Sequence, residues 1–485
     1  MKYEPICNYI NGKFITSSSK RNLGVVSPVD GEQLSVVPMS NSADLDAAVN
    51  AAKQAFPLWS KTPIKERVQV FFRYKVLLEK NLQKLAELCS AENGKTLAES
   101  IAEIEKCVEL TEFACSLPQL VTGELLEVSK GVECRTERIP LGIVASIVPF
   151  NFPSMVPNWT LPNAIALGNC MILKPSEKVP LSAGKLAELL LEAGLPAGVF
   201  NIVHGDVEIV EAICDHPEIE AVSFVGSTKV AKIVYQRATG NFKRCLALGG
   251  AKNHLIVLPD AIPGMTAQNI AASMSGCAGQ RCMAASAMVG VGGIDHIVEN
   301  ICDEAKKIIA GKNLGAVINK DSKERIEKYI TEAEEQGAKI LVDGRNVKVA
   351  GKENGTYVGP TVIDHVKPEM AIATEEIFGP VISIMRTDTI DEALAIENAS
   401  PYGNAASVFT QNGGAARYII DNASAGMIGV NVGVPVPREP FPFGGWNESK
   451  FGVGDITGKS SIEFWTKLKK STIKWNAEAG INWMS

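Results

Sequence analysis

The sequence predicts an α/β fold with doubly wound, largely parallel sheets. Two observations lead to this prediction. Short apolar segments alternate with helical patterns through the middle of the chain, and 485 residues are enough for roughly three domain-sized units. The expected strands lie at 143–148, 170–173, 200–203, 221–225 and 245–248, and the helices at 153–167, 180–193, 207–214 and 228–239. Ligands of such sheets bind at the carboxyl ends of the strands.

The N-terminal segment is expected to contain a β-hairpin and three helices. Tyr9–Ile15 has an Asn-Gly pair between apolar residues, which is a strong hairpin signal. Ser42 offers a helix cap, and Pro63 suits the first position of a helix. The helices are predicted at 42–56, 63–93 and 95–115.

Two further segments have the pattern of exposed strands. The stretch from Gly123 to Arg138 is polar and alternating, which predicts a hairpin. Because an isolated two-stranded hairpin is marginally stable, we expect it to pack on another subunit. Ile462–Trp465 predicts a terminal strand, followed by a basic stretch. Pairing of this strand with another subunit and a solvated tail are both open.

Composition excludes several classes of function. Lys and Arg number 48 against 54 Asp and Glu, and no dense basic segment is interleaved with aromatic residues, so nucleic acid and anionic membranes are not expected partners. The chain lacks an apolar signal core and an apolar run of ~18 residues, which predicts a soluble, cytoplasmic protein. Eleven scattered cysteines and five histidines show no metal-ligand spacing, so no metal site is expected.

A second α/β region is expected from about 249 to 430, and it contains a candidate nucleophile. Cys282 follows the run Gly276-Cys277-Ala278-Gly279-Gln280-Arg281. Small residues leave room for a substrate to approach the thiol, and the positive charge of Arg281 favours a thiolate. Helices are predicted at 295–308, 320–335 and 390–398, and a strand at 338–343.

The first α/β region has features of a nucleotide site. The strand ending at Val225 continues into Gly226-Ser227-Thr228 and a helix, where the helix N-terminus suits a pyrophosphate, although an ordinary helix cap would have the same sequence. Lys174 and Glu177 follow another strand and can bind ribose hydroxyls, and Glu177 would repel a 2′-phosphate, which favours NAD over NADP. No G-x-G-x-x-G motif is present, and Gly452-Val453-Gly454 is interpreted as a loop.

Read together, six motifs in order resemble those of the aldehyde dehydrogenase superfamily over essentially the whole chain. They are Pro149-Phe150-Asn151-Phe152-Pro153, Lys174-Pro175-Ser176-Glu177, Phe224-Val225-Gly226-Ser227, Gly279-Gln280-Arg281-Cys282, Glu375-Glu376-Ile377-Phe378-Gly379-Pro380 and Pro442-Phe443-Gly444-Gly445. The resemblance implies two doubly wound domains, one Rossmann-like and NAD-binding and one catalytic, with an oligomerisation hairpin and strand. It places the NAD-binding domain at 1–122 and 141–248, the catalytic domain at 249–435, a return linker at 436–459 and the oligomerisation elements at 123–140 and 460–485.

The resemblance also implies residue roles. Cys282 would attack the aldehyde carbon, and the Asn151 amide with the Cys282 N–H would hold the resulting oxyanion. Glu376 would bind the nicotinamide ribose. The remaining cofactor-binding positions are Phe150, Lys174, Glu177, Ser227 and Phe378.

One expected residue is absent. Hydrolytic members carry a glutamate that activates water at the position of Ala247 in Ala247-Leu248-Gly249-Gly250. Without this base, coenzyme A is the expected acyl acceptor. A hydrolytic enzyme with a base elsewhere and a catalytically silent protein on the same scaffold are the alternatives.

The missing base and the run Gly250–His254 resemble the CoA-acylating methylmalonate-semialdehyde dehydrogenase branch. That resemblance implies methylmalonate or malonate semialdehyde as substrate, decarboxylation, and propionyl-CoA or acetyl-CoA as product. Arg281 would hold the substrate carboxylate with its planar fork. A second arginine is expected in 95–115, where the nearest basic counterpart is Lys106. A homodimer or a dimer of dimers (a homotetramer) is expected.

Overall fold

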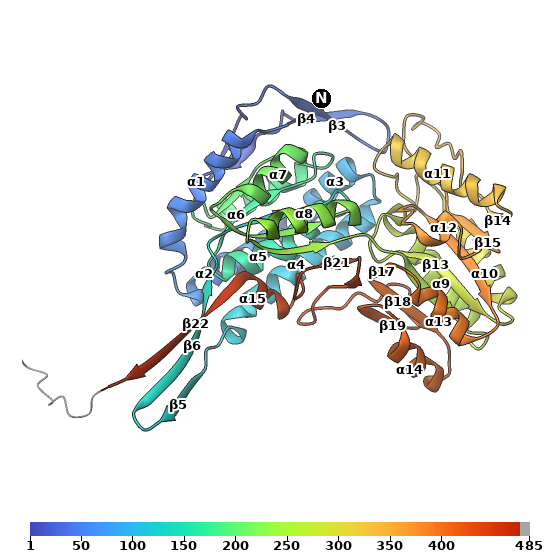
Figure 1. The fold of residues 1–485 in the computed structure, drawn as a ribbon. Coiled ribbons are helices and arrows are strands. Elements are labelled where there is room, and N and C mark those ends of the chain that lie inside the picture. Colours follow the sequence, from blue (N-terminus) through green and yellow to red (C-terminus); the bar gives the residue numbers. More distant parts are fainter. Residues whose placement is uncertain (476–485) are drawn as a thin grey trace, which may run out of the picture.

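A computed structural model describes residues 1–475 and contains two large sheets, one in each half of the molecule (Figure 1). In the first sheet, five parallel strands have the order β9-β8-β7-β10-β11. They are β7 (Ile143–Ile147), β8 (Cys170–Lys174), β9 (Phe200–Ile202), β10 (Ile219–Val225) and β11 (Arg244–Leu248). The chain first builds outward from β7 to β9 and then crosses to β10. The sheet therefore has a topological switch point between β7 and β10, where doubly wound folds bind ligands.

Helices cover both faces of this sheet. They are α5 (Met155–Ala166), α6 (Leu181–Glu192), α7 (Val207–Asp215) and α8 (Thr228–Gly240), with α1 (Ser42–Trp59) from the N-terminal segment. The other N-terminal helices, α2 (Ile64–Lys80), α3 (Leu82–Asn93) and α4 (Leu97–Leu120), pack on α5 and α6 and form an outer layer. The predicted alternation of strands and helices is confirmed. One continuous apolar core joins these helices to the strands.

Three details of the N-terminal helices differ from the predictions. Asn41, rather than Ser42, caps α1 and forms a capping box with Asp44. The helix predicted over 63–93 is two helices, because the Asn81 side chain bonds the Leu77 carbonyl at 2.9 Å and its backbone leaves the helical region. The helix predicted to end at residue 115 continues to 120, where burial of Leu117 holds an additional turn.

The predicted N-terminal hairpin is confirmed. β1 (Asn8–Ile10) and β2 (Lys13–Ile15) pair antiparallel and add to the first sheet beside β9. Asn11 and Gly12 both have positive φ, as a type I′ turn requires. A second hairpin, β3 (Asn22–Val26) with β4 (Gln33–Pro38), had no counterpart in the predictions.

The second sheet is also doubly wound, with the order β14-β15-β16-β13-β12-β18-β19. Its strands are β12 (Asn253–Val257), β13 (Ala285–Val291), β14 (Lys339–Val342), β15 (Thr361–Asp364), β16 (Val381–Thr387), β18 (Ala405–Phe409) and β19 (Met427–Val430). Only β14 among these is antiparallel to its neighbour. The helices are α9 (Pro263–Ser275), α10 (Asp295–Lys306), α11 (Lys320–Glu335), α12 (Ala371–Thr374), α13 (Ile390–Asn398) and α14 (Gly413–Asn422). The two-domain α/β prediction is thus confirmed.

An arm of three strands projects from the body (Figure 1). β5 (Leu125–Ser129) and β6 (Val132–Pro140) form the predicted hairpin, and β22 (Thr466–Lys474) pairs with the whole of β6. The prediction that Ile462–Trp465 is a strand is wrong. These residues belong to helix α15 (Ser460–Trp465), whose apolar side chains are buried and whose Trp465 carbonyl accepts a bond from Asn169. The terminal strand pairs within its own chain; residues 476–485 lie outside the described residues.

The segment between the second sheet and α15 returns to the first sheet. β20 (Trp446–Asn447) pairs with β17 (Tyr402–Gly403), and β21 (Lys450–Phe451) pairs antiparallel with β11 at the sheet edge. Gly452-Val453-Gly454 follows β21 as a loop, as expected. Within residues 1–475, no helix is long and apolar enough to cross a membrane. Nor does this range contain a cluster of three or more His, Cys, Asp or Glu able to hold a metal ion.

Candidate active site

Residues that follow strands of the first sheet, at its switch point, lie opposite a residue that precedes a strand of the second sheet. Phe150 and Asn151 follow β7, and Ser227 follows β10, whereas Cys282 precedes β13. Together they line a cavity of about 270 Å³, which we call the switch-point cavity. Its lining is Pro149, Phe150, Asn151, Phe152, Val156, Trp159, Val225, Gly226, Ser227, Gly249, Gly250, Cys282, Arg325, Glu376 and Phe378.

Cys282 also lines a second cavity, so the thiol lies between two pockets. This loop cavity, of about 420 Å³, lies between α4, α5 and the loop that precedes β20, and Arg281 and Lys106 line it. Phe152 and Trp159 are shared by both cavities. A molecule in either pocket can therefore approach the same sulfur.

The thiol of Cys282 is protonated at neutral pH in this state. Burial, reinforced by the negative charge of Glu376, raises the pKa of Cys282 to about 12. Arg281 opposes this only in part, because its Nη2 donates to the carbonyls of Ala272 and Ser273 at the end of α9. The guanidinium of Arg281 alone is therefore not enough to ionise the Cys282 thiol.

The loop before Cys282 is strained and is held by hydrogen bonds from other segments. Cys277 and Ala278 have φ of 52° and 53°, a conformation that costs non-glycine residues of order 1–3 kcal/mol each. The Cys277 N–H donates to Glu99 Oε1 at 2.5 Å, and Gln280 Oε1 accepts from the Ile318 N–H at 2.9 Å. These bonds tie the loop to α4 and to the segment before α11.

Asn151 is held through both its side chain and its backbone. Its side-chain Nδ2 donates to the Gln280 carbonyl at 3.0 Å, and its backbone carbonyl accepts from Lys95 Nζ at 2.7 Å. A carboxamide has two N–H donors, so one remains for a ligand in the switch-point cavity. Beside it, the rings of Phe150 and Phe378 meet edge to face with centroids 5.9 Å apart.

Glu376 is a buried carboxyl in this cavity. Burial raises its pKa to about 7, and the Ala251 N–H, which donates to Oε1 at 3.1 Å, opposes that rise. At Gly250, a Cβ would lie only 2.5 Å from Glu376 Oε2, so a larger residue there would displace this carboxyl. Lys252 is also buried, which lowers its pKa to about 7, and its Nζ donates to the Ile372 carbonyl at 2.7 Å.

Ser227 precedes α8 and makes no side-chain capping bond within the described chain. The first amides of this 13-residue helix are thereby left for an anion. Lys174 and Glu177 lie at the end of β8, outside the switch-point cavity, and form an ion pair of 3.2 Å.

Lys106 and Arg281, the two predicted substrate-binding residues in the loop cavity, have different partners. Lys106 Nζ lies 2.7 Å from Glu439 Oε2 and 3.1 Å from Glu109 Oε1, so two carboxylates neutralise its charge. The Nε of Arg281 is buried without a hydrogen-bond partner among residues 1–475. Arg438, absent from the predictions, also lines the cavity and is exposed.

Comparison with known proteins decides the family. Residues 14–471 match the sequence model of the aldehyde dehydrogenase family. This chain is an aldehyde dehydrogenase. It is 44% identical to malonate-semialdehyde dehydrogenase 2 of Geobacillus kaustophilus over 476 residues, covering 96% of this chain and 98% of that protein. It is 43% identical to malonate-semialdehyde dehydrogenase of Halalkalibacterium halodurans, with 97% and 99% covered.

Solved structures agree with this family. The methylmalonate-semialdehyde dehydrogenase of Oceanimonas doudoroffii superimposes with a TM-score of 0.96 at 42% identity, covering 98% of this chain and 99% of that chain. A candidate methylmalonate-semialdehyde dehydrogenase of Sinorhizobium meliloti, in complex with NAD, gives 0.97 at 42% identity, with 99% of each chain covered. The predicted superfamily is therefore confirmed.

In this aldehyde dehydrogenase, Ala247 is buried within β11 and lines neither cavity. Glu376 is the one carboxyl in the switch-point cavity among the described residues. Several site residues had no sequence signal, because their importance depends on distant partners. They are Lys95, Glu103, Arg325, Asn404 and Arg438. Lys252 and Asn253 belong to the run Gly250–His254 that carried the resemblance, but they were given no role.

Proposed function

We propose that this aldehyde dehydrogenase oxidises a short semialdehyde that bears a carboxylate, with NAD as the oxidant and CoA as the acyl acceptor. Methylmalonate and malonate semialdehyde are the substrates, and propionyl-CoA and acetyl-CoA the products. The observation that carries the proposal is the position of Cys282 between a cavity suited to a nicotinamide nucleotide and a second cavity lined by Arg281 and Arg438. The names of the related enzymes support the same substrate class.

The chain's residues fit NAD. Ser227 and the free N-terminus of α8 suit the pyrophosphate, and Glu376 beside Gly250 suits the nicotinamide ribose. Lys174 and Glu177 suit the adenosine ribose, and the carboxylate of Glu177 disfavours a 2′-phosphate. Bound NAD supplies the hydride acceptor for the aldehyde carbon.

Cys282 carries out the covalent chemistry. Its thiol loses a proton and its sulfur bonds to the aldehyde carbon, while the carbonyl π electrons move to the oxygen. The free N–H of Asn151 and the Cys282 N–H hold that oxyanion. Each such donor typically contributes about 3–4 kcal/mol to the transition state. Collapse to a thioester would pass the hydride to bound NAD. The acyl group then loses its carboxylate as CO2 and takes up a proton at the α-carbon, and the CoA thiol finally displaces Cys282.

The loop cavity supports recognition of the substrate carboxylate. Arg281 lines this cavity beside Cys282 and brings a positive charge to it. Arg438 supplies a second guanidinium, whereas Lys106 is already paired with Glu439 and Glu109. An arginine can bind a carboxylate through two parallel hydrogen bonds, which a lysine cannot.

CoA is favoured over water because Ala247 provides no general base. Such a base typically contributes 10²–10⁴-fold to a rate, so hydrolysis of the thioester should be slow. The alternative is a hydrolytic dehydrogenase that uses another base, with Glu376, of pKa about 7, as the nearest candidate.

The test follows NADH formation from methylmalonate semialdehyde and NAD, with and without CoA, and identifies the product by mass. We expect sustained turnover to propionyl-CoA only with CoA, and one NADH per site without it. Cys282→Ala should abolish both signals, whereas the matched control Cys277→Ala, in the same loop, should retain them. Steady release of a free acid without CoA would establish the hydrolytic alternative.

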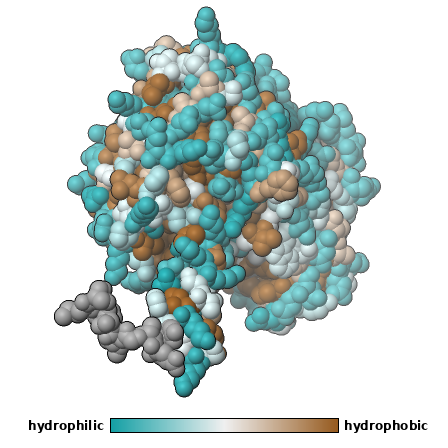
Figure 2. Space-filling model, turned by 60° about the vertical axis from the view of Figure 1, so that its left-hand side comes forward, coloured by the Kyte–Doolittle hydropathy of each residue, from teal (hydrophilic) through white to brown (hydrophobic). Residues whose placement is uncertain are grey.

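We also propose that the arm mediates assembly into a dimer or a dimer of dimers in the cytoplasm. Every residue of β5 is exposed, and Leu125 and Leu126 are each 66% exposed. Figure 2 shows this apolar surface on the projecting arm. Such an edge strand is a template for pairing with another chain. Light scattering that reports a monomer would refute this assembly.

A further inference from the structure

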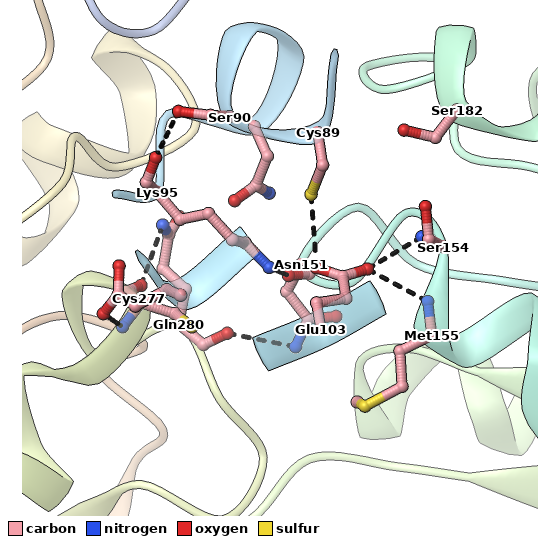
Figure 3. Close-up of polar contacts among 12 residues, drawn as sticks. Cys89, Ser90, Lys95, Glu103, Asn151, Ser154, Met155, Ser182, Cys277 and Gln280 are labelled. Atoms are coloured by element: carbon pink, nitrogen blue, oxygen red, sulfur yellow. Dashed lines mark hydrogen bonds and ion pairs between the residues drawn. The ribbon is translucent and has the colours of Figure 1, made fainter. Parts of the chain in front are cut away.

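A buried ion pair contacts the segment that carries Asn151, and one of its members, Glu103, lines the loop cavity (Figure 3). Lys95, in the connection between α3 and α4, places its Nζ 2.6 Å from Glu103 Oε2 on α4. The side chains are 1% and 0% exposed. Neither residue belongs to the chemistry proposed above, so the pair needs its own explanation.

All strong contacts of the Lys95 ammonium can be named. It donates to Glu103 and to the Asn151 carbonyl at 2.7 Å, and it lies 4.1 Å from the centre of the Phe152 ring. An ammonium has three N–H donors, so two hydrogen bonds and one cation–π contact satisfy it. Two of these three contacts are to residues of the loop that follows β7.

The carboxylate of Glu103 is satisfied in the same manner. Its Oε1 accepts from the N–H groups of Ser154 and Met155 at 2.8 and 3.0 Å. Its Oε2 accepts from Lys95 and from the Cys89 thiol. Apart from Cys89, every hydrogen-bond partner of the two charged groups outside the pair thus lies in residues 151–155, which run from the loop that carries Asn151 into the start of α5.

A buried ion pair is weak evidence for stability. Removing two charges from water costs several kcal/mol each, and apolar residues of similar volume often serve stability as well or better. The pair instead contributes to positioning, because its hydrogen bonds fix where the backbone of residues 151–155 lies. Asn93 acts in the same sense, donating from Nδ2 to the Phe150 carbonyl at 2.8 Å.

We infer that Lys95 and Glu103 are positioning residues that hold the Asn151 amide where the oxyanion forms. Electrostatic stabilisation of an oxyanion depends on donors fixed in advance at 2.7–3.1 Å, so a small shift of the loop loses much of the benefit. This inference rests on the oxyanion role proposed for Asn151.

The chain offers a matched control in Glu92, at the end of α3. It is also buried and also accepts backbone amides, those of Leu181 and Ser182 at 2.7 and 2.9 Å. Its contacts are at the start of α6, and none of its hydrogen bonds reaches residues 150–155 among the described partners. Loss of Glu92 should therefore affect stability without changing the oxyanion site.

The experiment measures the rate of the NADH burst without CoA, at saturating NAD, together with the thermal midpoint Tm. The aldehyde is uncharged propionaldehyde, so substrate carboxylate recognition does not enter. We expect Glu103→Gln and the double variant Lys95→Met with Glu103→Leu to slow the burst at least tenfold with KM for NAD unchanged. The double variant should keep Tm within a few degrees, and Glu92→Gln, whichever way it shifts Tm, should leave the burst unchanged.

A double-mutant cycle with Asn151→Ala separates positioning from a general structural role. If the pair acts through Asn151, Glu103→Gln should slow the burst no further in the Asn151→Ala background. The inference would be overturned if the slowing by Glu103→Gln and the slowing by Asn151→Ala multiplied in the combined variant. An unchanged burst in Glu103→Gln, or equal slowing by Glu92→Gln, would overturn it as well. Absence of a burst in the wild-type enzyme would instead refute the proposed function. If the double variant does not fold, Glu103→Gln, which preserves shape, decides the outcome.

Discussion

Asn253 donates a hydrogen bond of 2.7 Å from its side-chain amide to the backbone carbonyl oxygen of Cys282. Asn404 donates to the same oxygen at 2.9 Å. Asn253 begins β12 and Asn404 directly precedes β18, so the second sheet holds Cys282 by two carboxamides. The position of the thiol is therefore coupled to the packing of that sheet.

Replacing Asn253 and replacing Asn404 should have different effects on stability and on the NADH burst. Asn253 also bonds the Ala284 carbonyl and the Ala405 N–H, so Asn253→Ala leaves several buried groups unpaired and should cost roughly 1–3 kcal/mol for each. Asn404→Ala should lower stability less and mainly slow the NADH burst. Denaturant unfolding and burst kinetics on both variants test this; equal effects on stability would contradict it.

The raised pKa of Cys282 predicts how its reactivity depends on pH. Without NAD, alkylation of Cys282 by iodoacetamide should accelerate about tenfold for each pH unit between 7 and 9, because only the thiolate reacts. Glu376→Gln removes the second cause of the rise, so alkylation at pH 8 should become several-fold faster while NAD binding weakens. Mass spectrometry of the Cys282 peptide follows the reaction. A plateau already present at pH 7 would show that the thiol is ionised.

Substrate selection should depend on Arg438 more than on Lys106. Arg438→Ala should raise KM for malonate semialdehyde about tenfold and leave KM for propionaldehyde unchanged, because only the first substrate has a carboxylate. Lys106→Met should have a smaller effect, since two carboxylates already neutralise that charge. Steady-state kinetics with both aldehydes check this. Equal increases for the two substrates would indicate a loss of loop structure.

Glu92 predicts a dependence of stability on pH. Burial raises its pKa from 4.5 to about 7, so between these values the native state holds a proton that the unfolded state has released. The contribution of this group to stability therefore falls as pH rises from 4.5 to 7, by roughly 3 kcal/mol. Glu92→Gln should remove that fall. Urea unfolding at pH 5 and 7 measures it, and an unchanged difference in Glu92→Gln would refute it.

Local patterns determined much of this protein. The alternation of apolar strands and helices predicted the parallel strands of the first sheet, and the Asn-Gly pair predicted the first hairpin, since hydrophobic periodicity and turn chemistry act over a few residues. In the second sheet only one strand, at 338–343, was predicted from the pattern, and its doubly wound form was implied by the family resemblance. The motifs around Phe150, Cys282 and Glu376 identified segments that meet at one cavity. Their catalytic and binding roles stay predictions.

Tertiary structure decided the rest. The apolar run Ile462–Trp465 forms a helix because a pocket beside α5 buries it, whereas strand pairing begins only at Thr466. Lys106 is neutralised by Glu439, 333 positions away in sequence. The bonds from Lys95 to Asn151 likewise join segments that only the folded chain brings together. Packing between distant segments determines which polar groups meet in a buried site. Hydrophobic periodicity along the chain does not predict these contacts.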